Sequence, residues 1–462
     1  MIGMTNKITY DDSLMREVNL RQHGVTDSQM KQIADKTQVI YDTVQTKLAS
    51  GQLDFTALPK DISIEKSCKK IWGLYADKSK RLVVIGIGAA DQAAKMFYKA
   101  FRNNSSNKVA VEFAGFYTDP DEIDRLVNFV KGFEKETTII VLSKTGTTVE
   151  PFSTYLAMKS HFNSVLGSSW ASHFLCVTDP NGGLLLKEAQ TNNIHLIPTS
   201  KTGDRFAPLS SLGVLPSCIL NLRVGELFKG ANDMFAYCEN SPSQANVAWR
   251  IALYQHLYQE LYGISVFTVF TYISRLEEFN MWLRQLWGES LGKNDRGVLL
   301  FPAMGPKDQH SVLQMFNDGK WLSTFLFISQ RNFDTNVILS DVTLEDTKHF
   351  DRKSFSFITQ ASLRNTELTF NNYNRPSASL EIEKLDEYTF GTLIALFEMV
   401  VVYLGALLSI ENVFNQPGVT ESREFIDASM NRAGSDAALQ KLVSIESKIK
   451  RSSLSFPNGS GD

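Results

Sequence analysis

Short apolar runs alternate with amphipathic stretches from residue 81 onward, and this alternation is the strongest structural signal in the chain. The apolar runs are typical of buried strands, and the stretches between them have the spacing of helices. We expect strands at 81–86, 108–113, 138–143, 174–178 and 194–198, and helices at 91–101, 119–133, 147–162 and 183–190. Strands that alternate with helices form a parallel sheet with helices on both faces, so the pattern predicts a doubly wound α/β domain.

A second, less regular α/β pattern follows the first. It comprises a helical stretch at 231–261, strands at 266–270, 298–301 and 324–328, and a helix at 275–286. Residues 332–385 are polar and rich in strand-like runs, which indicates a peripheral excursion. We therefore expect four parts: an N-terminal helical extension at 1–63, a first α/β domain at 64–224, a second at 225–410, and a C-terminal helical segment with a mobile tail at 411–462.

Residues 389–410 form an apolar run that is long enough to raise the question of a membrane span. Glu398 and Tyr403 interrupt this run, which favours a buried central helix of a large domain. The formal net charge of -3 provides no general attraction for nucleic acid or an anionic membrane. Residues 1–12 lack the basic start and apolar core of a signal peptide, so we expect a cytoplasmic protein with no nucleic-acid or membrane partner.

Small hydroxyl residues gather behind the third predicted strand, where the chain enters a helix: Ser143, Lys144, Thr145, Gly146, Thr147 and Thr148. Ligands of an open parallel sheet bind beyond the carboxyl ends of the strands. The free N–H groups and the dipole at a helix start bind phosphate, hydroxyls add donors, and Gly146 lets the backbone come close. The alternative is that Thr147 or Thr148 merely caps the helix. Capping needs one hydroxyl rather than four, so we favour a site for a phosphomonoester.

Five stretches of the chain resemble signatures of the glucose-6-phosphate isomerase family and occur in the family's order. They are SKTGTTVEP at 143–151, GDRFAPLSSLG at 203–213, QLWGESLGK at 285–293, GPKDQHS at 305–311 and NVFNQPGV at 412–419. The resemblance implies two sugar-isomerase (SIS) domains, each a doubly wound parallel-sheet sandwich. It also implies a homodimeric enzyme of glycolysis and gluconeogenesis that interconverts glucose 6-phosphate and fructose 6-phosphate through a cis-enediol.

The resemblance assigns the proton transfer and the stabilisation of the enediolate to two residues. Glu289 is expected to be the base that moves a proton between C2 and C1 of the sugar. Leu286 and Trp287 precede it and are expected to desolvate its carboxylate and make it more basic. Arg205 is expected to face the developing enediolate oxygen, although it could instead pair with Asp204.

Ring opening and substrate binding fall to other residues of the matched stretches. His310 is expected to assist ring opening and to reach the active site of the neighbouring subunit. Arg423 stands where the family has a catalytic lysine. Gln285, one helical turn before Glu289, and Gln416 are expected to bind the sugar phosphate together with Gly86, Gly88 and the 143–148 loop. No cofactor is expected, and no cluster of His, Cys and carboxylates in the sequence suggests a metal.

The sequence departs from the family pattern at several supporting positions. Ala89 and Ala90 stand where the first loop has glycine and serine, and Asp204 stands where the arginine block has its second glycine. Thr420 replaces a glutamate, and Arg423 keeps a positive charge but cannot give up a proton near neutral pH. An active but divergent isomerase is the favoured hypothesis. A sugar-phosphate-binding or regulatory protein with weakened catalysis, and an isomerase that also accepts mannose 6-phosphate, are the alternatives.

Overall fold

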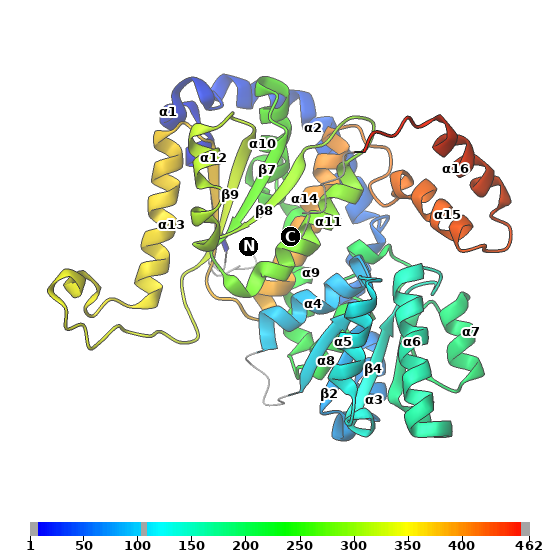
Figure 1. Ribbon diagram of the computed structural model, residues 1–462. Helices are drawn as coiled ribbons and strands as arrows, with labels where there is room; N and C mark the ends of the chain where they lie inside the picture. The colour runs from blue at the N-terminus through cyan, green and yellow to red at the C-terminus, as the bar shows by residue number, and fades with distance from the viewer. Residues whose placement is uncertain (1–7, 103–108, 454–462) are drawn as a thin grey trace, which may run out of the picture. The chain divides into compact units, whose positions relative to one another are not determined.

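The computed structural model describes residues 8–102 and 109–453, and of Asp204 it describes only the backbone. The chain divides into two compact units, Met1–Asn415 and Gln416–Asp462. The first unit contains two five-stranded sheets (Figure 1).

The first sheet is wholly parallel and has the strand order β3-β2-β4-β5-β6. Its strands are β2 (Arg81–Ile85), β3 (Ala110–Ala114), β4 (Thr137–Leu142), β5 (Phe174–Thr178) and β6 (His195–Pro198). This order confirms the predicted doubly wound domain. The chain builds outward from β2 first to β3 and then to the opposite side at β4, so the topological switch point lies between β2 and β4.

Helices cover both faces of this sheet because alternate strand residues point to opposite sides. Ile139 and Val141 pack against one helical layer, and Ile140 and Leu142 against the other. The first layer consists of α5 (Pro120–Val130), α6 (Val149–Leu166) and α7 (Leu184–Thr191) (Figure 1). The second layer consists of α3 (Ile62–Trp72), α4 (Ala89–Phe101) and α8 (Ser211–Ile219).

The second sheet has the strand order β1-β10-β9-β7-β8. Its strands are β1 (Ile8–Asp11), β7 (Val266–Thr271), β8 (Leu299–Met304), β9 (Ser323–Gln330) and β10 (Ser377–Ile382). The strands β7 to β10 are parallel and follow the same outward order as the first sheet, so the second domain is also doubly wound. The antiparallel β1 pairs with β10, although only helices were expected in the N-terminal extension, whose longest helix is α2 (Asp27–Ala49).

Residues 332–385 differ from the expected strand-rich peripheral excursion. They contain the helix α13 (Phe355–Asn372) and the strand β10, which lies inside the sheet between β1 and β9. Ser354 starts α13 by accepting a hydrogen bond from the Phe357 N–H (3.2 Å), and Phe370 of this helix is fully buried. The expectation was wrong because the polar residues between these contacts mask the helical pattern.

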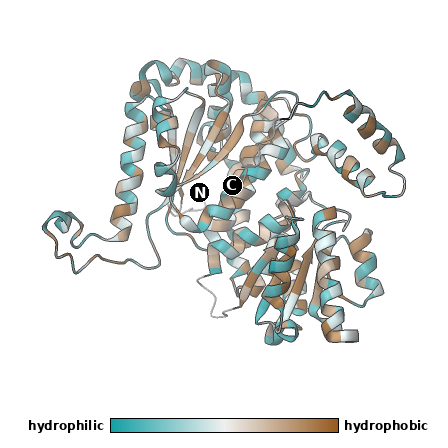
Figure 2. Cartoon of the chain, viewed as in Figure 1, coloured by the Kyte–Doolittle hydropathy of each residue, from teal (hydrophilic) through white to brown (hydrophobic). Residues whose placement is uncertain are grey.

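The helix α14 (Glu387–Leu407) runs through the interior of the first unit. Within the described residues, this one helix is long and apolar enough to cross a membrane. Of its most apolar stretch of 18 residues, 94% is buried inside the protein. In Figure 2 the brown colour of hydrophobic residues marks both this helix and the strands of the sheets. Gly391 lets it approach α9 (Val224–Asn240) so closely that an added Cβ would lie 2.0 Å from the Leu227 carbonyl oxygen. The expected central helix is therefore present.

Other helices complete the two units. The predicted helical stretch at 231–261 is two helices, α9 and α10 (Val247–Tyr262), because Asn246 ends the connection between them and caps α10. The helix α11 (Glu277–Leu291) packs against α4 of the first domain and thereby joins the two domains. The second unit holds α15 (Thr420–Ser429) and α16 (Asp436–Lys448), which an ion pair between Glu421 and Lys441 links.

Candidate functional site

Two loops meet at the switch point of the first sheet. One follows β2 and contains Gly86 and Gly88, and the other follows β4 and contains residues 143–148. A Cβ at Gly86 would lie 3.3 Å from the Leu142 carbonyl oxygen, so the first loop contacts the end of β4, directly before the second loop. The structure therefore brings both predicted binding loops to the carboxyl edge where an open parallel sheet binds ligands.

The 143–148 loop is held by its own side chains. Ser143 Oγ accepts a hydrogen bond from the Gly146 N–H (3.0 Å), and the hydroxyls of Thr145 and Thr147 lie 2.7 Å apart. Gly146 has a φ of 69°, and a Cβ there would lie 2.4 Å from the Leu185 nitrogen. The glycine therefore allows α7 to approach the loop, whereas the sequence was interpreted as a close approach to a ligand.

The start of α6 supports the phosphate interpretation over simple capping. Thr148 is the residue at the N-terminal boundary of α6, and among the described residues its side chain makes no capping hydrogen bond. The first N–H groups of α6 therefore point out of an uncapped helix end with a positive dipole. Lys144, whose ammonium donates to the Lys201 carbonyl (3.2 Å), adds positive charge to the loop. The arrangement suits a phosphate dianion.

Glu289 lies near the end of α11 with both carboxylate oxygens bonded. Gln285 Nε2 donates to Glu289 Oε1 (2.9 Å), and Arg205 Nη1 donates to Glu289 Oε2 (3.2 Å). The Gln285 amide also faces the first domain, because a Cβ at Gly88 would lie 3.0 Å from Gln285 Nε2. The structure thus brings together Glu289, Gln285, Arg205 and Gly88 where the two domains meet.

Arg205 is almost fully buried, with 3% of its surface exposed. Its Nε donates to Ser290 Oγ (2.9 Å), and its Nη2 donates to the carbonyls of Val413 (2.9 Å) and Asn415 (2.8 Å). The alternative pairing with Asp204 concerns a side chain outside the described part of the structure. Arg205 therefore touches the predicted base directly and ties it to the segment 412–415.

The predicted desolvation of Glu289 by Trp287 is wrong. Trp287 is fully buried, its ring centroid lies 5.0 Å from that of Phe267, and its indole N–H donates to the Val298 carbonyl (2.8 Å). Residues two apart on a helix do not face each other, so Trp287 belongs to the core and Glu289 to the opposite side of α11. The Glu289 side chain is 27% exposed.

Two residues of the site were quoted in the motifs but given no role. Ser290, directly after Glu289, accepts the hydrogen bond from Arg205. Lys293 donates to the Asn412 carbonyl (2.6 Å), and its pKa is lowered to about 8 because burial and the positive charge of Arg205 outweigh the attraction of Glu289. Their place in the matched stretch QLWGESLGK at 285–293 was the available signal for both.

His310 lies at the exposed end of the turn Lys307–His310. The turn is anchored by Asp308, whose Oδ2 accepts from the Met304 N–H (2.7 Å), and by Gln309, whose amide donates to the Tyr272 hydroxyl (2.6 Å). Among the described residues, no hydrogen bond or ion pair joins His310 to Glu289 or Arg205. Its role at a neighbouring subunit stays a prediction.

The altered loop after β2 carries no hydroxyl. Ala89 and Ala90 are buried, and Ala90 belongs to the main core. Asp91 is also buried and lies 2.5 Å from the Lys95 ammonium; burial raises the pKa of this carboxyl and Lys95 opposes the rise. Gly88, the residue before α4, has a φ of 65° and no side chain, so this second helix start also has no side-chain cap.

Two predicted site residues lie in the second unit. Gln416 and Arg423 belong to the unit Gln416–Asp462, and their predicted roles stay predictions. Within residues 8–102 and 109–453, no group of three or more His, Cys, Asp and Glu side chains could hold a metal ion.

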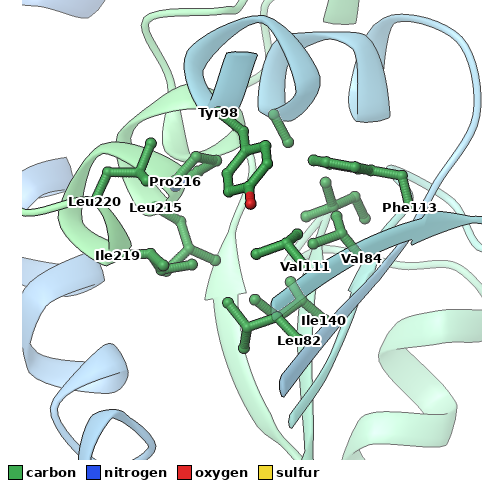
Figure 3. A pocket seen from close by; sticks show the side chains of 12 residues that line it. Leu82, Val84, Tyr98, Val111, Phe113, Ile140, Leu215, Pro216, Ile219 and Leu220 are labelled. Carbon is green, nitrogen blue, oxygen red and sulfur yellow. The ribbon is translucent and has the colours of Figure 1, made fainter. Parts of the chain in front are cut away.

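An apolar cavity of about 30 Å³ lies inside the first domain, between the sheet and the helices α4 and α8 (Figure 3). Side chains such as Leu82, Val111 and Leu215 line it, and the Tyr98 hydroxyl points into it. None of the predicted site residues contributes to its walls. Its size and apolar lining do not suit a sugar phosphate, so it is separate from the candidate site.

The fold and the site define a two-domain, doubly wound α/β protein with an uncapped helix start at the edge of the first sheet and a carboxylate–arginine pair at the domain junction. The chain belongs to the phosphoglucose isomerase family, whose model matches residues 60–440. This confirms the family that the sequence motifs indicated.

Relatives and solved structures agree with this family assignment. The chain is 29% identical to glucose-6-phosphate isomerase of Methanocaldococcus jannaschii over 392 residues, which cover 83% of this chain and 91% of the relative. It is also 29% identical to glucose-6-phosphate isomerase of Mycoplasmopsis pulmonis, covering 88% of this chain and 97% of the relative. The crystal structure of a hypothetical protein from Thermus thermophilus shares the fold, with a TM-score of 0.81 at 22% identity over 92% of this chain and 100% of that one.

Proposed function

We propose that this chain is an aldose-ketose isomerase that interconverts glucose 6-phosphate and fructose 6-phosphate. The single observation that carries the proposal is the placement of Glu289. Its carboxylate is oriented by Gln285 and Arg205 at the point where α11 meets the start of α4. The uncapped start of α6 lies at the same edge of the first sheet and is suited to the phosphate of the substrate.

The chemistry needs one group that can accept and return a proton. The Glu289 carboxylate removes the C2 proton of open-chain glucose 6-phosphate, the C2–H electron pair forms a C1=C2 double bond, and negative charge moves to O1. After the O2 proton has moved to O1, Glu289 returns its proton to C1 and fructose 6-phosphate results. The hydrogen bond from Arg205 Nη1 to Glu289 Oε2 (3.2 Å) holds the carboxylate in one orientation for both proton transfers.

The supporting roles rest on the family resemblance. His310, exposed on its anchored turn, is proposed to assist ring opening in the neighbouring subunit of a homodimer. Arg423 is proposed to take the place of the family's lysine in ring opening. Gln416 is proposed to bind the phosphate or the sugar, and Ser143, Thr145 and Thr148 are proposed to bind the phosphate. The reaction needs no cofactor, and the cytoplasm, where glycolysis and gluconeogenesis run, stays the predicted location.

A sugar-phosphate-binding protein without turnover is the second candidate. Two observations favour it: the buried Ala90 supplies no hydroxyl to the loop after β2, and Arg205 already binds Glu289, Ser290 and two backbone carbonyls. Such a protein would bind fructose 6-phosphate and gain thermal stability without converting it.

Glucose 6-phosphate with deuterium at C2 separates the two candidates. An isomerase moves the label from C2 to C1 of fructose 6-phosphate or loses it to solvent, and NMR follows both. A binding protein leaves the label at C2 while its melting temperature rises with the sugar phosphate.

A further inference from the structure

Two cations bind the same short segment of backbone at the candidate site. Arg205 Nη2 donates to the carbonyls of Val413 (2.9 Å) and Asn415 (2.8 Å), and Lys293 Nζ donates to the carbonyl of Asn412 (2.6 Å). We call residues 412–415 the clamped segment. Hydrogen bonds from charged donors are stronger than those between neutral groups, so the two side chains fix this segment more firmly than ordinary turn contacts would.

Lys293 is placed by the same helix that carries Glu289. The helix α11 ends at Leu291, and residues 293–296 form a tight turn in which Asn294 and Asp295 both have positive φ (56° and 54°). Arg296 at the end of this turn donates to the Leu408 carbonyl (2.8 Å), which anchors the turn to the end of α14. Lys293 is therefore presented to the clamped segment from a fixed position relative to Glu289.

The clamped segment is also packed on its apolar side. The Phe414 ring lies 4.8 Å from the ring of Phe206, the residue after Arg205, and the Phe414 N–H donates to Asn412 Oδ1 (2.8 Å). The chain continues directly from this segment to Gln416. The segment thus has fixed contacts through Lys293, Arg205 and Phe206.

We propose that Lys293 is a positioning residue of the isomerase site: by binding the Asn412 carbonyl it fixes the clamped segment, which in turn keeps Arg205 against Glu289. The proposal rests on the isomerase function proposed above. Arg205 contacts both Glu289 and the clamped segment. Movement of the segment therefore changes the direction of the hydrogen bond from Arg205 to Glu289. Misplacing a catalytic group by about 1 Å can lower a rate about 100-fold.

The charged groups that face Lys293 are Arg205 and Glu289. Because burial and Arg205 lower the Lys293 pKa to about 8, its ammonium loses a proton at a pH where an exposed lysine stays charged. The hydrogen bond from Lys293 to the Asn412 carbonyl therefore weakens as the pH rises above about 8. An arginine at the same position would keep its charge there.

The test compares Lys293→Met, Lys293→Arg and the control Lys78→Met. Lys78 also donates to one backbone carbonyl, that of Ser172 (2.7 Å), but at the amino edge of the first sheet, opposite the site. Lys293→Met should lower kcat at pH 7 about 10- to 100-fold with KM for fructose 6-phosphate little changed. Hydrogen exchange of the amides of 412–415 should become faster in this variant. Lys293→Arg should restore most of the turnover and move the alkaline fall in kcat to higher pH.

Two results would overturn the proposal. One is a kcat of Lys293→Met within about twofold of the wild type, and the other is an equal loss of kcat in Lys78→Met. If the wild-type chain itself shows no turnover, the proposed isomerase function fails first. Hydrogen exchange still decides the positioning role in that case, because unchanged exchange at 412–415 in Lys293→Met contradicts it without any activity measurement.

Discussion

The Arg205 guanidinium lies 3.2 Å from the Glu289 carboxylate and connects the first domain to the helix α11 of the second. The pair is asymmetric, because Arg205 is 3% exposed and the Glu289 side chain 27%. A buried cation with fixed partners beside a more accessible carboxylate orients the carboxylate while leaving it open to substrate. Substitutions that disturb the Arg205–Glu289 contact should therefore alter turnover.

Replacing Arg205 by lysine should damage both stability and turnover. A lysine cannot reach Ser290, Glu289 and the carbonyls of the 412–415 segment at once, so buried acceptors lose their donors. We expect the free energy of unfolding in urea to fall by about 3 kcal/mol, as for other buried pairs that lose one partner. Arg125→Lys is the control: Arg125 is 49% exposed and bonded to Glu112 and Glu122, and this variant should lose less than about 1 kcal/mol. Equal losses in the two variants would contradict the role given to Arg205.

Gly88→Ala should disturb the helix α11, which carries Gln285 and Glu289, although Gly88 itself lies in the other domain. Gly88 has a φ of 65°, and its new Cβ would meet the Gln285 amide at 3.0 Å. The displaced amide would no longer orient Glu289, so kcat should fall about 10-fold or more. Gly132→Ala separates this contact from backbone strain, because Gly132 has a φ of 80° and no atom within 4 Å of the new Cβ. Each variant should lose about 1 kcal/mol of stability from strain, but only Gly88→Ala should lose turnover.

Thr148→Ala should weaken phosphate binding without destabilising α6. The Thr148 side chain makes no capping hydrogen bond within the described structure, so its removal should change the free energy of unfolding by less than about 0.5 kcal/mol. The KM for fructose 6-phosphate should rise about 10-fold if the hydroxyl donates to the phosphate. Ser354→Ala serves as the comparison, since Ser354 does cap α13 and its loss should cost about 1 kcal/mol. A cost in Thr148→Ala as large as in Ser354→Ala would favour the capping role.

Glu398 makes the stability of the fold depend on pH. It is fully buried in α14, its Oε2 has no hydrogen-bond partner among the described residues, and burial raises its pKa well above the usual value. Because the folded pKa lies above the unfolded one, the folded state keeps the proton longer, and stability is lost as the pH rises above the unfolded value of about 4.5. Glu398→Gln has no such proton to lose. Urea unfolding at pH 5 and pH 8 should show that its advantage over the wild type is larger at pH 8, and an equal difference at both values would contradict this.

Local patterns were sufficient for the parts of the structure that local rules determine. The strand around Ile139 was predicted because a short apolar run between two helical stretches is typical of a buried strand, and Gln285 was placed beside Glu289 because residues four apart share a helix face. The hydrogen bond from Arg205 to the carbonyl of Val413, 208 residues later, could not be predicted, since a sequence does not show which backbone carbonyl a side chain reaches. Trp287 was misassigned for a related reason: sequence adjacency to Glu289 does not tell which face of α11 each residue occupies.

A coupled assay of fructose 6-phosphate conversion, with a dehydrogenase that reads glucose 6-phosphate, tests the central claim most directly. The wild type, Glu289→Gln and the control Glu136→Gln are compared; Glu136 pairs with Lys80 on the surface at the amino edge of the first sheet. The account predicts turnover in the wild type and in the control, and a kcat lower by about 1000-fold in Glu289→Gln, with folding intact. Turnover of Glu289→Gln equal to that of the wild type would contradict the role of Glu289 as the base.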